Sequence, residues 1–228
     1  MKKTAFVVII LSTISLTISA QSIDFPLKNS IDSVSYALGL NVAAQIQNQG
    51  IEKLNPEKVA EAIAHYYEGI DPLILPAEAS SYFNNYLQNQ KQMLAKSNLA
   101  ASMKFLEENK NKEGITELPS GLQYKILKKG TGPIPKKGQK VTAHYTGKLA
   151  NGTIFDSSVQ RGKPFSVKVG TGRVIKGWDE VLQLMPVGSK WEIYLPPNLA
   201  YGVNPRPGSG IEPNDLLIFE LELLSIDQ

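Results

Sequence analysis

Few side chains in this sequence could act as a nucleophile or as a metal ligand. It contains two histidines, His65 and His144, and no cysteine. It has neither the HExxH pattern of a zinc-binding helix nor the GxSxG turn of a hydrolase serine. His144 stands beside Tyr145 in a strand-like stretch, so their side chains point to opposite faces. Asp156 has no second carboxylate near it in sequence with which to form an acid–base pair. These patterns argue against metal-dependent or covalent hydrolysis, and we predict neither a metal site nor a cofactor.

Glycines at positions 170, 172 and 177 raise the question of a phosphate-binding loop. The stretch GTGRVIKGW lacks the Lys-Ser or Lys-Thr ending of a P-loop, and its GxGxxxxG spacing is not the GxGxxG of dinucleotide sites. Its neighbours also lack the pattern of a parallel βαβ unit. The net charge of +3, with a weakly acidic segment before a weakly basic one, gives no argument for nucleic acid. We therefore reject a nucleotide or nucleic-acid site.

The remaining candidates are aromatic and aliphatic side chains. They come from separated segments of the second half of the chain, so only the fold can bring them together. Such a set forms an ordinary core in most domains and a binding pocket in some, and composition leaves both interpretations open. The set comprises Tyr145, Phe155, Phe165, Val174, Ile175, Trp178, Tyr201 and Phe219.

A sheet is expected to position these residues, because the sequence alternates with a period of two from Gly121 onward. The dipeptide Asn151-Gly152 predicts a hairpin, and Lys176–Leu184 predicts one short helix. We expect an antiparallel sheet of about five strands with that helix packed on it, preceded by a linker at residues 115–120. The predicted strands are residues 121–127, 140–149, 165–169, 189–195 and 216–226.

Residues 24–113 have the period of helices instead. Ser30–Gln49 is amphipathic, and Gly50 ends it. Asn55-Pro56 opens a second helix with a good N-cap followed by a proline suited to the first turn. After Pro76, no proline or glycine interrupts the chain up to about Lys112. That stretch predicts a helix roughly 50 Å long.

The long helix carries an apolar stripe that includes Phe83, Met93 and Leu99. Two shorter helices offer too little surface to cover it. We therefore expect the helical segment to form a homodimer. A solvated connecting rod is the alternative.

Residues 1–20 have the form of a signal peptide. Lys2 and Lys3 precede an apolar run that ends in the small residues Ser19-Ala20. A membrane anchor is the alternative, but the run is short and contains Ser12, so we expect no stable membrane span. The absence of cysteine leaves no residue for a lipid at the cleavage site or for a disulfide. We expect an exported protein.

Several motifs, in order, resemble the FK506-binding-protein (FKBP) type of peptidyl-prolyl isomerase over residues 120–227. They are VTAHYTGKLANGTIFDSS, RGKPF, VIKGWDEVLQLMPVGSKWEIYLPPNLAYG and IEPNDLLIFELELL. The preceding segment, through SYALGLNVA and the long helix that runs into GLQY, resembles the helical dimerisation domain of the macrophage-infectivity-potentiator and periplasmic chaperone type. The resemblance implies an α+β chain, with helical domain 24–113 before isomerase domain 120–228. The isomerase domain would be a half-barrel wrapped around one short helix.

The resemblance also implies a role for each candidate residue. Trp178 would form the pocket floor beneath the proline ring, and the backbone N–H of Ile175 would bind a substrate carbonyl. The hydroxyl of Tyr201 would hydrogen-bond the substrate. Asp156 would be the polar group of the pocket and would pair with Arg161. The walls and rim would consist of Tyr145, Phe155, Phe165, Val174, Phe219 and Ile211. The loop after Tyr201, which carries two prolines and Arg206, puts substrate preference in doubt.

The implied reaction needs no nucleophile. Rotation about an X–Pro bond has a barrier of about 18–20 kcal/mol that arises from amide resonance. An apolar pocket destabilises the planar, more zwitterionic amide relative to the twisted one, which is differential binding of the transition state. The implied partners are proline-containing unfolded or partly folded polypeptides, with FK506 or rapamycin as ligands. The implied location is the periplasm, with outer-membrane or cell-surface association as the alternative.

A peptide-binding chaperone with an inactive pocket is the other function class. The combined presence of Tyr145, Asp156, Trp178 and Tyr201 favours the enzyme, because an unused pocket has no need of all four.

Overall fold

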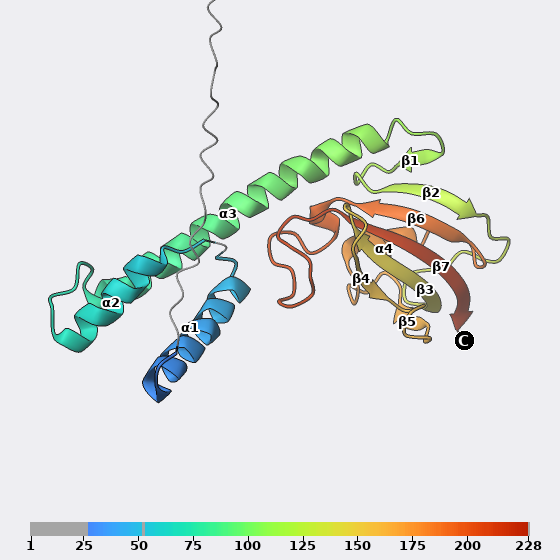
Figure 1. Cartoon of the computed structure of the whole chain (residues 1–228). Coiled ribbons are helices and arrows are strands. Elements are labelled where there is room, and N and C mark those ends of the chain that lie inside the picture. Colours follow the sequence, from blue (N-terminus) through green and yellow to red (C-terminus); the bar gives the residue numbers. More distant parts are fainter. Residues whose placement is uncertain (1–26, 52, 228) are drawn as a thin grey trace, which may run out of the picture. The chain divides into compact units, whose positions relative to one another are not determined.

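The computed structural model describes residues 27–51 and 53–227 (Figure 1). The predicted signal peptide at residues 1–20 lies outside the described residues. Two compact units divide the chain, Met1–Glu52 and Lys53–Gln228. The first contains one described helix, and the second contains the remaining helices and the sheet.

The first two helices begin at asparagine caps. In α1 (Ser30–Asn48) the side chain of Asn29 accepts a hydrogen bond from the first turn. In α2 (Pro56–Glu68) Asn55 does the same, and Gly69 ends the helix in the left-handed conformation. These ends confirm the sequence prediction to within one residue, because each cap is a local interaction between neighbours in sequence.

The long helix α3 (Pro76–Asn109) ends three residues before the predicted Lys112. Its first two-thirds leave large apolar side chains exposed, among them Tyr82, Phe83 and Met93. Its last turns are different, because Ser102, Leu106 and Asn109 are buried there. Among the described helices, none combines the length and the apolar character needed to span a bilayer.

In the described part of the chain, the sheet has seven strands, all paired antiparallel (Figure 1). The order is β1-β2-β6-β7-β3-β4, and β5 pairs with the other end of β3. The sheet is open, and the five predicted strands and the hairpin at Asn151-Gly152 are confirmed. The strands are β1 (Ile115–Glu117), β2 (Gln123–Lys128), β3 (Lys140–Leu149), β4 (Ile154–Ser157), β5 (Phe165–Lys168), β6 (Lys190–Leu195) and β7 (Leu217–Asp227).

The predicted linker at residues 115–120 is wrong in its first half. Residues 115–117 form β1, in which Thr116 pairs with Tyr124 at the edge of the sheet. Three residues are too few to display an alternating pattern. The strand exists because a partner edge is available, and the local sequence does not show that partner.

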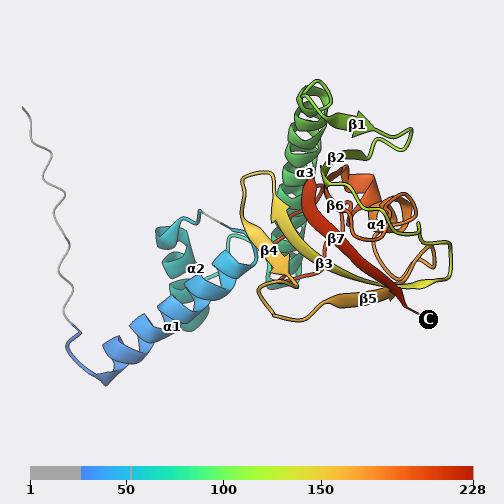
Figure 2. The same ribbon diagram turned by 90° about the vertical axis from the view of Figure 1, so that its right-hand side faces the viewer.

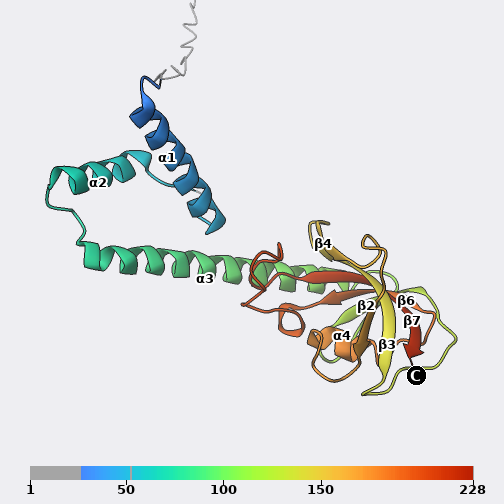
Figure 3. The same ribbon diagram turned by 90° about the horizontal axis from the view of Figure 1, so that it is seen from below.

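The sheet packs a helix on each face (Figures 2 and 3). The short helix α4 (Lys176–Val181) lies on the inner face and joins the main core. The last turns of α3 pack on the outer face through Leu106. Neighbouring residues of β6 illustrate the division, because Ile193 belongs to the inner core and Tyr194 to the outer cluster. Because of this alternation, the side chains that contact α3 and those that contact α4 come from opposite faces of the same strand.

A buried polar network joins α3 to β2. The Gln123 side chain is fully buried, and its amide nitrogen donates to the Leu106 carbonyl at 2.8 Å and to Glu117 at 2.7 Å. Its oxygen accepts from the amide of Asn109 at 3.0 Å. Each polar group of the Gln123 amide therefore has a partner inside the protein, as burial requires.

We predict that Gln123→Leu lowers the free energy of unfolding by about 1–3 kcal/mol, because it leaves the Asn109 amide buried without its acceptor. Urea unfolding monitored by circular dichroism measures the change. Gln88→Leu, at an exposed position of α3, is the matched control and should unfold near the wild-type midpoint. Equal midpoints for the two variants would contradict a stabilising role for the network.

Candidate active site

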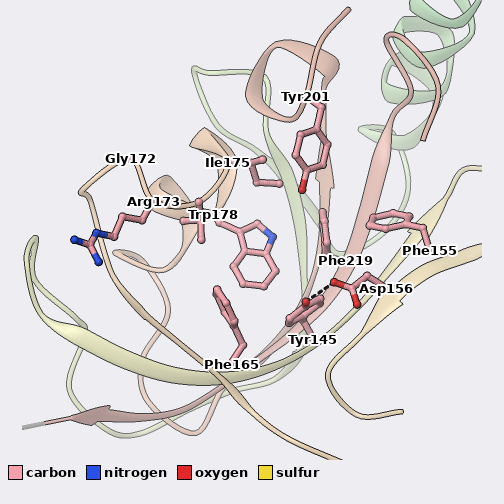
Figure 4. Close-up of a pocket in the computed structure, with 11 residues that line it drawn as sticks. Tyr145, Phe155, Asp156, Phe165, Gly172, Arg173, Ile175, Trp178, Tyr201 and Phe219 are labelled. Carbon is pink, nitrogen blue, oxygen red and sulfur yellow. Dashed lines mark hydrogen bonds between the residues drawn. The ribbon is translucent and has the colours of Figure 1, made fainter. Parts of the chain in front are cut away.

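A cavity of about 360 Å³ opens between the inner face of the sheet and α4 (Figure 4). Its lining comes from β3, β4, β5, β7, α4, the turn before α4 and the segment after β6. All predicted site residues except Arg161 and Ile211 line it. The lining residues are Tyr145, Phe155, Asp156, Phe165, Gly172, Arg173, Val174, Ile175, Trp178, Tyr201 and Phe219.

Trp178 is the floor of this cavity, and only 4% of its surface is exposed. Three rings meet its indole edge to face. Their centroids lie 4.9 Å away for Tyr145, 5.4 Å for Phe219 and 6.0 Å for Phe165. This arrangement is favoured because the positive edge of one ring meets the negative face of another. The rings therefore pack against one another and form the walls of the cavity.

One corner of the apolar cavity is polar. The Tyr145 hydroxyl donates to a carboxylate oxygen of Asp156 at 2.5 Å, drawn as the dashed line in Figure 4. Arg161 forms an ion pair with the other carboxylate oxygen and donates to the Tyr145 hydroxyl at 2.9 Å. Its guanidinium also lies 5.6 Å from the Tyr145 ring centroid. The predicted pairing of Asp156 with Arg161 is confirmed.

Both the helical segment and the sheet domain of this chain are similar to known proteins. A family model described as FKBP-type peptidyl-prolyl cis-trans isomerase matches residues 132–224. A second, described as the domain amino terminal to that isomerase, matches residues 31–126. The FKBP-type 22 kDa peptidyl-prolyl cis-trans isomerase of Escherichia coli (strain K12) is 42% identical over 195 residues, which span 84% of this chain and 93% of that protein. The chain belongs to the FKBP-type peptidyl-prolyl cis-trans isomerase family.

Two further proteins are similar to most of this isomerase. The outer membrane protein MIP of Legionella longbeachae is 41% identical over 206 residues, which span 86% of this chain and 85% of that protein. The crystal structure of FkpA from Escherichia coli matches with a TM-score of 0.70 at 27% identity and covers 89% of this chain and 99% of that one. Both likenesses extend beyond the isomerase domain into the helical segment.

The two remaining predicted residues lie outside the cavity lining. Arg161 does not line the cavity but contacts two residues that do, Asp156 and Tyr145, and half of its side chain is exposed. Ile211 is only 8% exposed, packs in the main core and is not among the residues that line the cavity.

Three positions for which the sequence predicted no role contribute to this cavity. Gly172 and Arg173 line the cavity. Gly147 lies in β3, where an added Cβ would be 2.6 Å from the Phe155 ring and 2.7 Å from the Phe219 ring. A glycine inside an alternating strand is a recognised sign of close approach by another group, and here the group is a pair of cavity walls.

The glycine loop rejected as a phosphate site does bind an anion, but the anion is internal. The backbone N–H groups of Gly170 and Gly172 donate to the two carboxylate oxygens of Asp179, both at 2.8 Å. Both glycines have positive φ, +70°, which their lack of a Cβ allows. The loop is therefore occupied by α4's own carboxylate, and it holds the turn before Trp178 in place.

The charges at the polar corner have defined states. Burial acts to raise the pKa of Asp156, but the hydrogen bonds from Tyr145 and Arg161, with the arginine charge, bring that pKa below its usual range. Burial and the bond to Asp156 raise the pKa of Tyr145. Burial, followed by the charge of Asp156, raises the pKa of Tyr201. At neutral pH the corner thus holds an ionised Asp156 bonded to the neutral hydroxyl of Tyr145, and the hydroxyl of Tyr201 is neutral as well.

We predict that Arg161→Met raises the pKa of Asp156, because burial then acts against fewer opposing groups. Carboxyl ¹³C NMR across an acid titration measures this directly. Because the folded pKa lies below the unfolded one, the stability that Asp156 contributes is present above the unfolded pKa and is lost as pH falls through the folded value.

Arg173→Met is the matched control for this titration, since Arg173 lines the same cavity but forms no hydrogen bond with Asp156. It should leave the carboxyl titration near its wild-type position. An Arg161→Met protein with a wild-type titration curve would show that Arg161 does not set the ionisation of Asp156.

Proposed function

We propose that the aromatic cavity is the isomerase active site and that it receives the proline of an X–Pro bond against Trp178. The observation that carries this is a floor and walls formed mainly by aromatic rings that pack against one another, with Asp156 and the Tyr145 hydroxyl at one corner. A pyrrolidine ring has no charge and no N–H, so an apolar pocket with rigid walls suits it. The family resemblance supports the same placement.

The proposed mechanism is non-covalent. The cavity excludes water from the amide, which disfavours the planar, zwitterionic form relative to the twisted one. The N–H of Ile175 is proposed to bind a substrate carbonyl. Among the described residues this N–H donates to no protein acceptor, while the Ile175 carbonyl accepts from the N–H groups of Trp178 and Asp179 in the first turn of α4. Tyr201 is proposed to donate a hydrogen bond to the substrate as the amide twists.

Asp156 is proposed to act on the substrate with its carboxylate while it fixes the Tyr145 ring. An ionised group in an apolar cavity costs free energy unless it is paired, and Arg161 compensates its charge from outside the lining. Phe155 and Phe219 are proposed to complete the wall on that side. Each tenfold gain in rate needs about 1.4 kcal/mol, so a few such contacts suffice.

Further proposals concern the domain organisation, the location and the assembly of the whole chain. We propose domain boundaries at residues 24–113 and 120–228, a signal peptide at 1–20, and export to the periplasm or the outer membrane. A relative named as an outer membrane protein supports export.

We further propose a homodimer through the N-terminal helices, in which two isomerase sites act on one unfolded client and avidity compensates for weak binding at each. Exposed apolar side chains along α1 and α3 support it.

We predict that Tyr201→Phe lowers kcat/KM about three- to tenfold, the equivalent of one hydrogen bond, and that Asp156→Ala lowers it at least as much. Isomerisation of a short proline peptide, followed by NMR exchange, gives the rate, and FK506 should inhibit it. Tyr66→Phe and Asp71→Ala, at exposed positions, are the matched controls and should retain full rate.

Unchanged rates in both cavity variants would show that the site assignment is wrong. A wild-type protein without isomerase activity and without FK506 binding would instead support the inactive peptide-binding scaffold.

We predict that residues 21–228 sediment as a dimer and that Val34→Glu with Leu38→Glu shifts them to monomer. Both side chains are exposed on α1, and a buried charge in an apolar interface is unfavourable. Sedimentation velocity measures the mass. Ile134→Glu, an exposed apolar position outside the helices, is the control and should stay dimeric. A monomeric wild type would contradict the proposed assembly.

A further inference from the structure

The segment that carries Tyr201 extends from η1 (Pro197–Leu199) to the start of β7. Its last part, residues 213–215, lies against α3, and Figures 1 and 3 show the loop before β7 alongside that helix. One wall of the cavity and the long helix are therefore attached to opposite ends of a single loop.

Four hydrogen bonds attach the loop to α3. Asn98 donates its side-chain amide to the Pro213 carbonyl at 3.0 Å and to the Asp215 carboxylate at 3.1 Å. Ser102 donates its hydroxyl to the Asn214 carbonyl at 2.9 Å. In the opposite direction, the side-chain amide of Asn214 donates to the Ala95 carbonyl at 3.0 Å. The three helix residues follow one another at spacings of three and four, so one face of α3 makes every contact.

Asn214 also contacts the part of the loop next to Tyr201. Its backbone N–H donates to the carbonyl of Gly202 at 2.8 Å, and Gly202 directly follows Tyr201. Its φ is +60°, the only positive value among the described non-glycine residues. Asparagine tolerates this left-handed conformation better than most residues do. A single strained residue thus connects the backbone of α3 to the residue beside Tyr201.

Tyr201 needs such support. Its side chain is 43% exposed, so packing holds it on one side only and its position depends on its backbone. Substrate contacts in an enzyme site lose effect when they move by about an ångström. The other aromatic residues of the cavity pack against one another, whereas among the described residues Tyr201 takes part in none of these ring pairs.

We propose that Asn214 is a positioning residue for the isomerase reaction, which holds Tyr201 in place by linking Gly202 to α3. The end of the long helix is then part of the active-site scaffold as well as a connector. This inference rests on the proposed role of Tyr201 in binding substrate.

Asn214→Gly in the full-length protein tests it. Glycine accepts the positive φ without strain and can keep both backbone hydrogen bonds, so the variant removes the Asn214 side chain with its amide donor to Ala95. We expect kcat/KM to fall about threefold to tenfold, as for the loss of one hydrogen bond. Asn111→Gly is the matched control, because Asn111 donates its amide to a carbonyl of α3, that of Glu107, without touching the loop. It should keep full activity.

A double-mutant cycle with Tyr201→Ala separates positioning from general stability. If Asn214 acts through Tyr201, then Asn214→Gly has little further effect once the Tyr201 ring is gone. Ser102→Ala removes a helix-side contact to the same residue and should repeat the pattern. All rates are measured at a temperature well below each variant's unfolding midpoint, so that unfolded protein does not contribute to the difference in rate.

Equal fold-losses from Asn214→Gly in both backgrounds would overturn the inference, and so would full activity of both Asn214→Gly and Ser102→Ala. In either case a loss of activity in Tyr201→Ala alone would leave the proposed function standing. Full activity of Tyr201→Ala would instead overturn the proposed role of Tyr201 and this inference with it.

Discussion

The packing of Trp178 against the inner face of the sheet is the interaction on which the site depends. The helix that carries it, α4, has six residues, too few to be stable alone. Its position comes from three consecutive residues. Gly177 allows close approach, since a Cβ there would lie 2.5 Å from the Leu195 side chain. Trp178 meets the rings of the sheet, and Asp179 binds the glycine loop. Each of these contacts helps to hold the cavity floor in place.

An aromatic cavity with a carboxylate at one corner must meet two opposing requirements. Amide rotation is favoured by an environment with little water, yet a carboxylate in such an environment tends to become protonated. Arg161 removes the conflict, because it holds Asp156 ionised from a position that does not line the cavity. Tyr145 links this corner to the ring cluster, since its hydroxyl contacts Asp156 and its ring contacts Trp178.

The long helix uses different chemistry along its length. Its early turns expose large apolar side chains, which suit the proposed interface with a second copy. Its later turns present polar side chains and carbonyls to the isomerase domain, among them Asn98, Ser102 and Asn109. Directional hydrogen bonds define a position more sharply than apolar contacts do. They are therefore suited to a joint that must fix both the sheet and the loop next to the cavity.

The sequence alone was sufficient wherever the deciding interaction is local. The caps of α1 and α2 and the hairpin at Asn151-Gly152 depend on neighbours along the chain, and the alternation that marks the five predicted strands is visible in the local sequence. Most of the cavity lining also followed, because the motif resemblance covers residues that lie far apart. Only the tertiary structure decided that 115–117 form a strand, that Ile211 belongs to the core, and that Asp179 occupies the glycine loop. It also decided that Asn214 joins α3 to the segment of Tyr201. Each of these depends on a partner distant in sequence, and the type of a residue does not reveal which distant group the fold will bring to it.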